Sequence, residues 1–485
     1  MNIRAVLRLV AVVLIIIGTA MVICAGVAHL YGDPARTKYA MLTASAVVVC
    51  LGLAGVVLTR GADSRELGRR DGFAIVSLGW LAAAVAGSLP YILSGLIGNP
   101  VSAVFETMSG LTTTGATVLS NLEEVPRGLL LWRATTHFFG GMGVLILCVA
   151  VLPFLRVGGM QIYRAELPGP EKERLTPRLV TTARALWGVY VLLCLAEILL
   201  LMVGGMNLFD AVCHTFATMA TGGFSTRSQS IGAYDSAYLE VVIIVFMLLA
   251  GTNFALHYRA LRGDLGHYLR NFEFRGYLII WLAACCLLAV LVSGSGNYDD
   301  VGRAVRAAFF QGTSIMTTTG FTTADFDTWP NPARLLLVIL MFVGGCAGST
   351  GGGMKVFRIL VGAKKVVRDL FRYMRPRVVL RIWVGQRALD EDTVSHVASF
   401  ILLFVGMFAG ATVVMAFFTP DLETAAASVA ATLGNIGPGL GAVGASENYA
   451  GIPVAGQVVL TLCMLLGRLE LYTVLVMFMP GFWKR

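Results

Sequence analysis

The segment Met316-Thr-Thr-Thr-Gly-Phe-Thr322 reveals the repeat pattern of this chain, because three other segments can be aligned with it. The four segments read LTTTGAT at 111–117, MATGGFS at 219–225, MTTTGFT at 316–322 and LGNIGPG at 433–439. The glycines that they share are 108, 97 and 117 residues apart. Three spacings near one hundred, each in the same hydropathy context, predict an internal repeat.

The composition around these segments is typical of a membrane protein. Of the 485 residues, 57% are hydrophobic and 13% are charged, whereas a soluble domain carries about 25% charged residues. A soluble enzyme and a disordered chain are therefore excluded. Long apolar runs without barrel-type alternation predict an all-α polytopic membrane protein. Spans are expected at about 9–30, 39–59, 72–94, 129–155, 180–204, 237–258, 277–294, 333–349, 397–418 and 454–480.

Shorter stretches precede the aligned segments and are too polar to cross a membrane alone. They lie at about 100–113, 207–219, 300–316 and 422–434, and we expect each to dip into the membrane and return. The predicted parts are a two-helix N-terminal domain at 1–71 and span–pore-helix–span repeats at 72–178, 179–275, 276–392 and 393–485. All four repeats run the same way, which favours parallel repeats around a pseudo-fourfold pore.

The excess of basic residues has a topological interpretation. The formal net charge is +9, with 37 Lys and Arg against 28 Asp and Glu. With both termini in the cytoplasm, 28 of the 37 basic residues fall in the inner stretches 1–8, 60–71, 156–184, 259–275, 355–392 and 484–485. Eight fall in outer stretches, Arg133 among them, and this split agrees with the positive-inside rule. The excess therefore does not indicate a nucleic-acid partner, and the first apolar run is interpreted as a retained helix rather than a signal peptide.

The aligned segments have the chemistry of a site for a monovalent cation. Irregular backbone at membrane depth is tolerated only where it lines water or is buried in protein, and four such loops can offer carbonyl oxygens to an ion. Glycine permits the backbone angles required, and the ends of four half-helices carry partial negative charge. The alternative is that these small residues only pack helices together. Four equivalent segments favour the cation site.

On these residues the chain resembles the Trk/Ktr/HKT superfamily of potassium transporters, and most of all the bacterial Trk-type transmembrane subunit. The resemblance covers nearly the whole chain and includes the specific string Gly434-Asn-Ile-Gly-Pro-Gly439. It implies a potassium filter formed by Thr113, Thr114, Gly115, Thr221, Gly222, Gly223, Thr318, Thr319, Gly320, Asn435, Ile436 and Gly437. Sodium-preferring members have serine at the position of Gly115, so potassium is expected. Gly222 departs from the threonine of repeats one and three.

A glycine-rich interruption in the third repeat is the predicted gate. The string Gly344-Gly-Cys-Ala-Gly-Ser-Thr-Gly-Gly-Gly353 should break a helix, because glycine destabilises helix interiors. It lacks the strand and the spacing of a phosphate-binding loop. The resemblance implies an intramembrane loop beneath the filter, whereas the alternative is a kink for packing. The implied gate residues are Gly344, Gly345, Gly348, Gly351, Gly352, Gly353 and Arg468.

Arg468 lies inside the last predicted span, where a charge needs compensation. One interpretation is a local pair with Glu470, although residues two apart do not share a helix face. The other, which the resemblance supports, is that Arg468 points into the pore below the filter and repels cations until the loop moves. We favour the second interpretation.

The remaining polar residues show no enzyme site, cofactor site or metal-ligand spacing. Glu106, Glu197 and Asp210 are expected either to stabilise half-helices or cations in the vestibule, or to be paired structurally. The six histidines are expected to be structural and the nine cysteines to be small buried hydrophobes. No catalytic motif is visible, so no enzyme activity is predicted.

The expected partners follow mainly from the resemblance. Residues 355–392 carry ten Lys or Arg against four acidic residues, which suits either anionic headgroups or a docked regulatory protein. The family forms homodimers in the bacterial inner membrane and pairs with a cytoplasmic nucleotide-binding subunit of Rossmann type. The alternative function is an ion-coupled secondary symporter that moves K⁺ with H⁺ or Na⁺, which would predict inverted repeats and a midplane pocket.

Overall fold

The computed structural model describes residues 1–61, 68–150, 175–378, 380–385 and 387–483. Within them the chain is helical apart from one short hairpin, in which β1 (Trp383–Val384) pairs antiparallel with β2 (Arg387–Ala388). The predicted all-α class is therefore confirmed for these residues. The inner stretches expected at 60–71 and 156–184 lie partly outside them, as does the end of the span expected at 129–155, and 484–485 lie wholly outside them.

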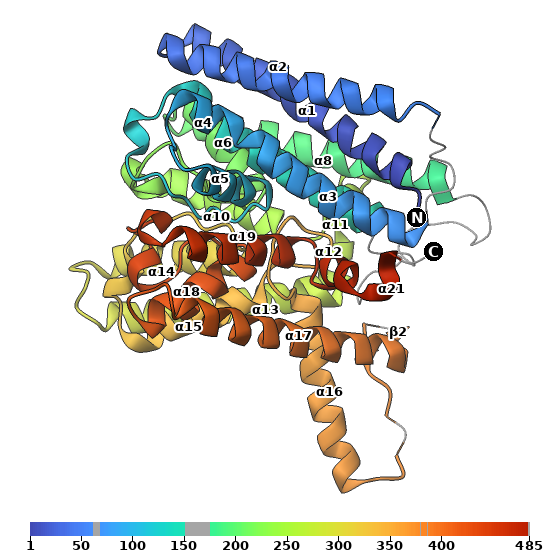
Figure 1. Cartoon of the computed structure of the whole chain (residues 1–485). Coiled ribbons are helices and arrows are strands. Elements are labelled where there is room, and N and C mark those ends of the chain that lie inside the picture. Colours follow the sequence, from blue (N-terminus) through green and yellow to red (C-terminus); the bar gives the residue numbers. More distant parts are fainter. Residues whose placement is uncertain (62–67, 151–174, 379, 386, 484–485) are drawn as a thin grey trace.

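Two long helices open the chain and pack along one edge of the bundle (Figure 1). They are α1 (Ile3–Leu30) and α2 (Ala35–Leu58). Small residues let them approach closely, because a side chain at Gly18 would overlap Val49, and Ser45 Oγ donates to the carbonyl of Gly18 at 2.7 Å. This is the usual packing of helices in lipid. The outer face stays apolar, with Leu58 84% exposed, as expected of a surface that faces lipid.

Four successive groups of helices follow, each built around one short helix. The first contains α3 (Arg69–Gly87), α4 (Leu89–Ser94), α5 (Pro100–Leu111) and α6 (Arg127–Ala150). The second contains α8 (Leu175–Val203), α9 (Leu208–Met219), α10 (Ala237–Ala250), α11 (Phe254–Leu261) and α12 (Gly266–Arg270). The third contains α13 (Phe272–Ser293), α14 (Val301–Met316), α15 (Asn331–Val343) and α16 (Val356–Met374). The fourth contains α17 (Glu391–Met415), α18 (Leu422–Leu433), α19 (Val454–Arg468), α20 (Tyr472–Leu475) and α21 (Pro480–Trp483).

The short helices α5, α9, α14 and α18 begin in the same way. Each has an Asn or Asp N-cap whose side chain accepts a backbone amide of the first turn: Asn99, Asn207, Asp300 and Asp421. Such caps satisfy amides that the helix leaves unpaired. Three of the helices have 12 residues and α14 has 16, so at about 1.5 Å per residue all are shorter than the bilayer core of about 30 Å.

The expected spans are present with three differences. Among the described residues, six helices are long and apolar enough to cross a membrane, or eight if two bent pairs each count as one span. The expected span at 237–258 bends by 101° between α10 and α11, and the expected span at 454–480 bends by 109° after α19. The bends coincide with Asn253, which caps α11, and with Glu470, whose φ of 58° is left-handed. The span expected at 333–349 ends at Val343.

Both termini lie at the same end of the bundle, and α16 points away from it (Figure 1). The amide of Asn2 donates to Asp71 at 2.7 Å, and Arg70 donates to the carbonyl of Phe482 at 3.5 Å, so both ends lie at the start of α3. Arg133, which was counted among the basic residues of the outer stretches, lies within α6 and is 1% exposed.

Candidate functional site

The loops that follow the four short helices share one backbone conformation. The residue two before each aligned glycine is left-handed, with φ between 50° and 60°: Thr113, Thr221, Thr318 and Asn435. The aligned glycines are left-handed too, with φ between 76° and 100°: Gly115, Gly223, Gly320 and Gly437. In the first loop the amides of Thr113 and Thr114 return to the carbonyls of Gly110 and Ser109, and the other three loops repeat this pattern. Each helix therefore ends in a Schellman-type cap.

The four loops also contact one another in a closed order. A side chain added at Gly115 would overlap the carbonyl oxygen of Gly222 in the second loop. The other three aligned glycines show the same contact. Gly223 lies against the carbonyl of Thr319, Gly320 lies against the carbonyl of Ile436, and Gly437 lies against the carbonyl of Thr114. Each glycine thus makes room for a carbonyl of the next loop, and the fourth loop returns to the first. We call this arrangement the loop ring, formed by residues 113–115, 221–223, 318–320 and 435–437.

The loop ring brings carbonyl oxygens and threonine hydroxyls together in a buried place. Thr112 and Thr114 share a hydroxyl hydrogen bond of 2.8 Å, and Thr317 and Thr319 share another of 2.8 Å. Within the described ranges, no donor pairs with the backbone carbonyls of Thr114, Thr319 or Ile436. Buried carbonyls normally find a partner. These oxygens are therefore candidate ligands for a cation.

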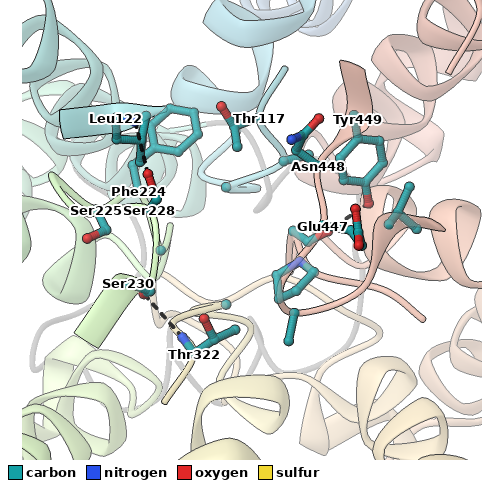
Figure 2. A pocket seen from close by; sticks show the side chains of 18 of the residues that line it. Thr117, Leu122, Phe224, Ser225, Ser228, Ser230, Thr322, Glu447, Asn448 and Tyr449 are labelled. Atoms are coloured by element: carbon teal, nitrogen blue, oxygen red, sulfur yellow. Dashed lines mark hydrogen bonds between the residues drawn. The ribbon is translucent and has the colours of Figure 1, made fainter. Parts of the chain in front are cut away.

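A pocket of about 80 Å³ opens on one side of the ring, and all four aligned glycines line it. Figure 2 shows side chains from the four groups of helices around this space. Neighbouring groups are tied together there: the amide of Leu122 donates to Ser228 at 3.0 Å, and the amide of Thr322 donates to Ser230 at 3.2 Å (Figure 2). Tyr449 Oη donates to the carbonyl of Gly437 at 2.7 Å. We call this side of the ring the outer side, following the charge distribution.

Behind the outer side lies a buried ion pair of Glu106, whose partner the sequence did not identify. Arg133 Nε donates to Glu106 Oε1 at 2.8 Å, with the two side chains 1% and 0% exposed. Glu106 also accepts the hydroxyl of Thr117 and, at 2.9 Å, the amide of Val118. The pair therefore fixes the chain just beyond the first loop. A carboxylate and an arginine 27 residues apart give no helical signal that links them.

None of the three candidate carboxylates, Glu106, Glu197 and Asp210, is among the residues that line this pocket. Asp210 accepts the hydroxyl of Thr226 at 2.7 Å and an amide hydrogen of Asn207 at 2.9 Å, and it pairs with Arg227 at 3.3 Å. Glu197 is fully buried on α8. Of the two roles considered for these acids, structural pairing describes Glu106 and Asp210.

On the opposite side of the ring, residues 344–355 form a non-helical loop between α15 and α16. Gly344, Gly348 and Gly353 are left-handed, with φ between 71° and 77°. The loop therefore uses conformations that glycine adopts without strain. The predicted helix break is present, and we call these residues the inner loop.

The inner loop lies against the C-terminal ends of three short helices. The amide of Gly352 donates to Thr318 Oγ1 at 2.6 Å, and the amide of Gly353 donates to the carbonyl of Gly434 at 3.0 Å. The hydroxyl of Thr350 donates to the carbonyl of Met219 at 3.0 Å. The inner loop thus covers the negative ends of these helices.

Arg468 joins the inner loop to two helices. It is 4% exposed at the end of α19, and it donates to the carbonyls of Thr350 at 2.6 Å and Gly140 at 3.2 Å. Glu470, the local partner considered for Arg468, pairs with Arg358. The predicted gate glycines and Arg468 are therefore brought together beneath the ring.

Comparisons with known proteins agree on one family. The family model described as "TrkH: Cation transport protein" matches residues 39–485. The chain is 41% identical to the Trk system potassium uptake protein TrkH of Halomonas elongata and 40% identical to that of Escherichia coli, with both chains covered completely in each case. The crystal structure of the potassium transporter TrkH from Vibrio parahaemolyticus matches with a TM-score of 0.92 at 38% identity, again over the whole of both chains.

Proposed function

Because this chain belongs to the TrkH family of cation transport proteins, we propose that it takes up potassium ions through the loop ring. The resemblance inferred from the four segments is confirmed by that membership. The relatives are named as transporters rather than enzymes, which agrees with the expectation of no catalytic activity.

The observation that carries the proposal is the closed order of contacts among the four loops. Twelve residues form the filter: Thr113, Thr114, Gly115, Thr221, Gly222, Gly223, Thr318, Thr319, Gly320, Asn435, Ile436 and Gly437. Their uncharged oxygens replace the hydration shell of a monovalent cation. No carboxylate lies among these twelve, so the ring does not have the charge of a calcium-type filter. The four helix groups act as parallel repeats around a pseudo-fourfold pore, with the boundaries given above.

Conduction is controlled on the inner side. The inner loop closes the pore beneath the filter, and Arg468 places a positive charge there. Since Arg468 is bonded to the carbonyl of Thr350, opening requires that this contact break or move with the loop. Cations then pass between the filter and the cytoplasm.

The proposed setting is the bacterial inner membrane, with both termini in the cytoplasm. The basic stretch 355–392 then lies on the cytoplasmic side, in agreement with the positive-inside rule. We include in the proposal a homodimer and a cytoplasmic nucleotide-binding regulatory subunit of Rossmann type, because this chain carries no nucleotide motif of its own.

Complementation tests the proposal directly. The chain is expressed in a bacterium that lacks potassium uptake systems, and growth is measured at low K⁺ together with tracer Rb⁺ and Na⁺ uptake. We expect growth and Rb⁺ uptake well above the empty vector. Absence of both from cells that contain the folded protein in the membrane would contradict the proposal.

Rb⁺ flux into proteoliposomes distinguishes the proposed filter from the alternative function, an ion-coupled symporter. An ion-coupled symporter needs a proton or sodium gradient to accumulate Rb⁺, whereas a passive filter passes Rb⁺ down its own gradient. Rb⁺ flux in sodium-free medium without a proton gradient is the expected result.

A further inference from the structure

One histidine connects the first group of helices to the second filter loop. His137 lies on α6, is fully buried, and places Nδ1 2.7 Å from the carbonyl of Gly110. Its Nε2 accepts the amide of Phe224 at 3.1 Å. Since a carbonyl only accepts and an amide only donates, these contacts select the neutral ring with its proton on Nδ1. His137 thus bridges the end of α5 and the residue after Gly223.

The phenylalanine that His137 contacts is held from two sides. The His137 and Phe224 rings stack with centroids 4.2 Å apart, and the guanidinium of Arg133 lies 4.0 Å from the Phe224 ring centroid. Both partners come from α6. The chain directly after the second filter loop is therefore positioned by a neighbouring repeat rather than by its own helix.

The same ring explains the departure noted at Gly222. The equivalent positions are Thr114, Thr319 and Ile436, so only the second loop lacks a side chain there. A Cβ at Gly222 would lie 2.7 Å from three atoms of the His137 ring. The imidazole occupies the space that a side chain of the loop fills in the other three repeats.

We infer that His137 is a specificity-determining positioning residue for the second filter loop. Its two hydrogen bonds and its ring hold the Gly222 carbonyl against Gly115, in place of the hydroxyl pairs that brace loops one and three. Without His137, the second filter loop is free to move inward and coordinate a smaller ion. This inference rests on the proposed function, because it concerns the choice between ions in that filter.

The test compares ion preference with transport itself. H137F retains a ring without its two hydrogen bonds, H137A removes the ring, and H137Q keeps an acceptor for the Phe224 amide. Each variant is quantified in the membrane and checked by size-exclusion chromatography, and Rb⁺ and Na⁺ uptake are measured in parallel. We expect the Rb⁺/Na⁺ ratio to fall about tenfold in H137A and H137F, the scale of one or two lost hydrogen bonds, and less in H137Q.

A double-mutant cycle tests the steric part of the inference. G222A should lower Rb⁺ uptake strongly beside His137 but much less in the H137A background, where the ring is gone. G406A, on α17 with open space around it, serves as the control and should lower Rb⁺ uptake little in either background.

The outcomes separate this inference from the proposed function. If the wild type takes up no Rb⁺, the proposed function fails. If the wild type takes up Rb⁺ but H137F and H137A keep its ion ratio, the inference is overturned and the function stands. Equal costs of G222A in both backgrounds would overturn the claim that the ring occupies the side-chain position.

Discussion

The outer and inner sides of the loop ring are built on different plans. On the outer side, four loops of similar backbone meet, and each contributes one glycine to the same pocket. On the inner side, among the residues that the structure describes, the third group supplies the loop at the ring, and Arg468 from the fourth group is hydrogen-bonded to it. In the proposed function, the four loops on the outer side offer their oxygens to an ion, and the inner loop with Arg468 is the single obstacle that has to move.

Under the proposed function, this contrast indicates where selectivity and control reside in a chain built of four similar groups. A site made of four equal parts suits a spherical ion, because every direction around the axis is alike. A gate needs an element with two positions, and such an element arises when one copy departs from the others. Here that departure is the glycine-rich run between α15 and α16.

The largest effect is expected from a methyl group inside the ring. Gly320→Ala places Cβ against the carbonyl of Ile436 at a φ of 85°. Overpacking of about 1–3 kcal/mol added to left-handed strain of about 1–2 kcal/mol should lower Rb⁺ uptake about a hundredfold or more.

Gly296→Ala is the matched control for that change. Gly296 has a φ of 75° but open space around it, so it shares the strain without the collision. Near-normal uptake is expected from Gly296→Ala, and equal losses from the two variants would refute the ring as the transport site.

The second-largest effect is expected on the stability of the protein, through the buried ion pair behind the outer side of the loop ring. Glu106→Gln leaves the Arg133 charge buried without its carboxylate, and breaking a buried pair costs about 3–5 kcal/mol. The melting temperature in detergent should fall by many degrees. Glu423→Gln is the control, because Glu423 pairs with Arg334 at the surface with 46% of its side chain exposed, and it should shift the melting temperature little.

The third effect concerns the inner side. Arg468→Ala removes the cation bonded to Thr350, and flux in proteoliposomes should rise by about threefold or more, since a positive charge in a pore opposes cations. Arg468→Lys keeps the charge and should raise flux less. Unchanged or lower flux from well-folded Arg468→Ala protein would argue against Arg468 as a barrier.

The smallest effect is expected on α16, away from the ring. A hydrogen bond from Lys365 lowers the pKa of the Asp369 carboxyl. The depressed pKa means that the stabilisation is present at neutral pH and lost as pH falls through the folded-state pKa. A half-exposed pair of this kind contributes under about 1 kcal/mol, so Asp369→Asn should barely change the melting temperature at pH 7. A shift as large as that of Glu106→Gln would show that α16 is not an independent surface helix.

Much of this arrangement was predictable from local sequence. The four loops follow from glycine spacing, and the helix break at 344–355 follows from glycine content, because both signals lie in adjacent residues. The bends after α10 and α19 were missed, because the spans were assigned from the overall apolar character of each stretch, and the polar residues Asn253 and Glu470 at the two breaks were not interpreted as turns.

Contacts between distant residues were not predictable from one sequence. Glu106 and Arg133 each read as an isolated charge, and His137 reads as a lone polar residue on an apolar helix. Their partners come from other helices, so only packing reveals them. The local pair of Arg468 with Glu470 was the less favoured of two interpretations; in the structure Arg468 donates to the carbonyl of Thr350, and Glu470 pairs with Arg358.

The contact of each filter glycine with the following loop has a mechanical consequence. Because the four loops contact one another in a closed circle, no loop can move outward from the ring unless its neighbours move too. The contacts between neighbouring loops, rather than the residue types of any one loop, then maintain the ring. This accounts for the segment LGNIGPG, which lacks the threonines of the other three segments. A segment can differ in most of its residues and still close the ring, provided that its glycine leaves room for the carbonyl oxygen of the adjacent loop.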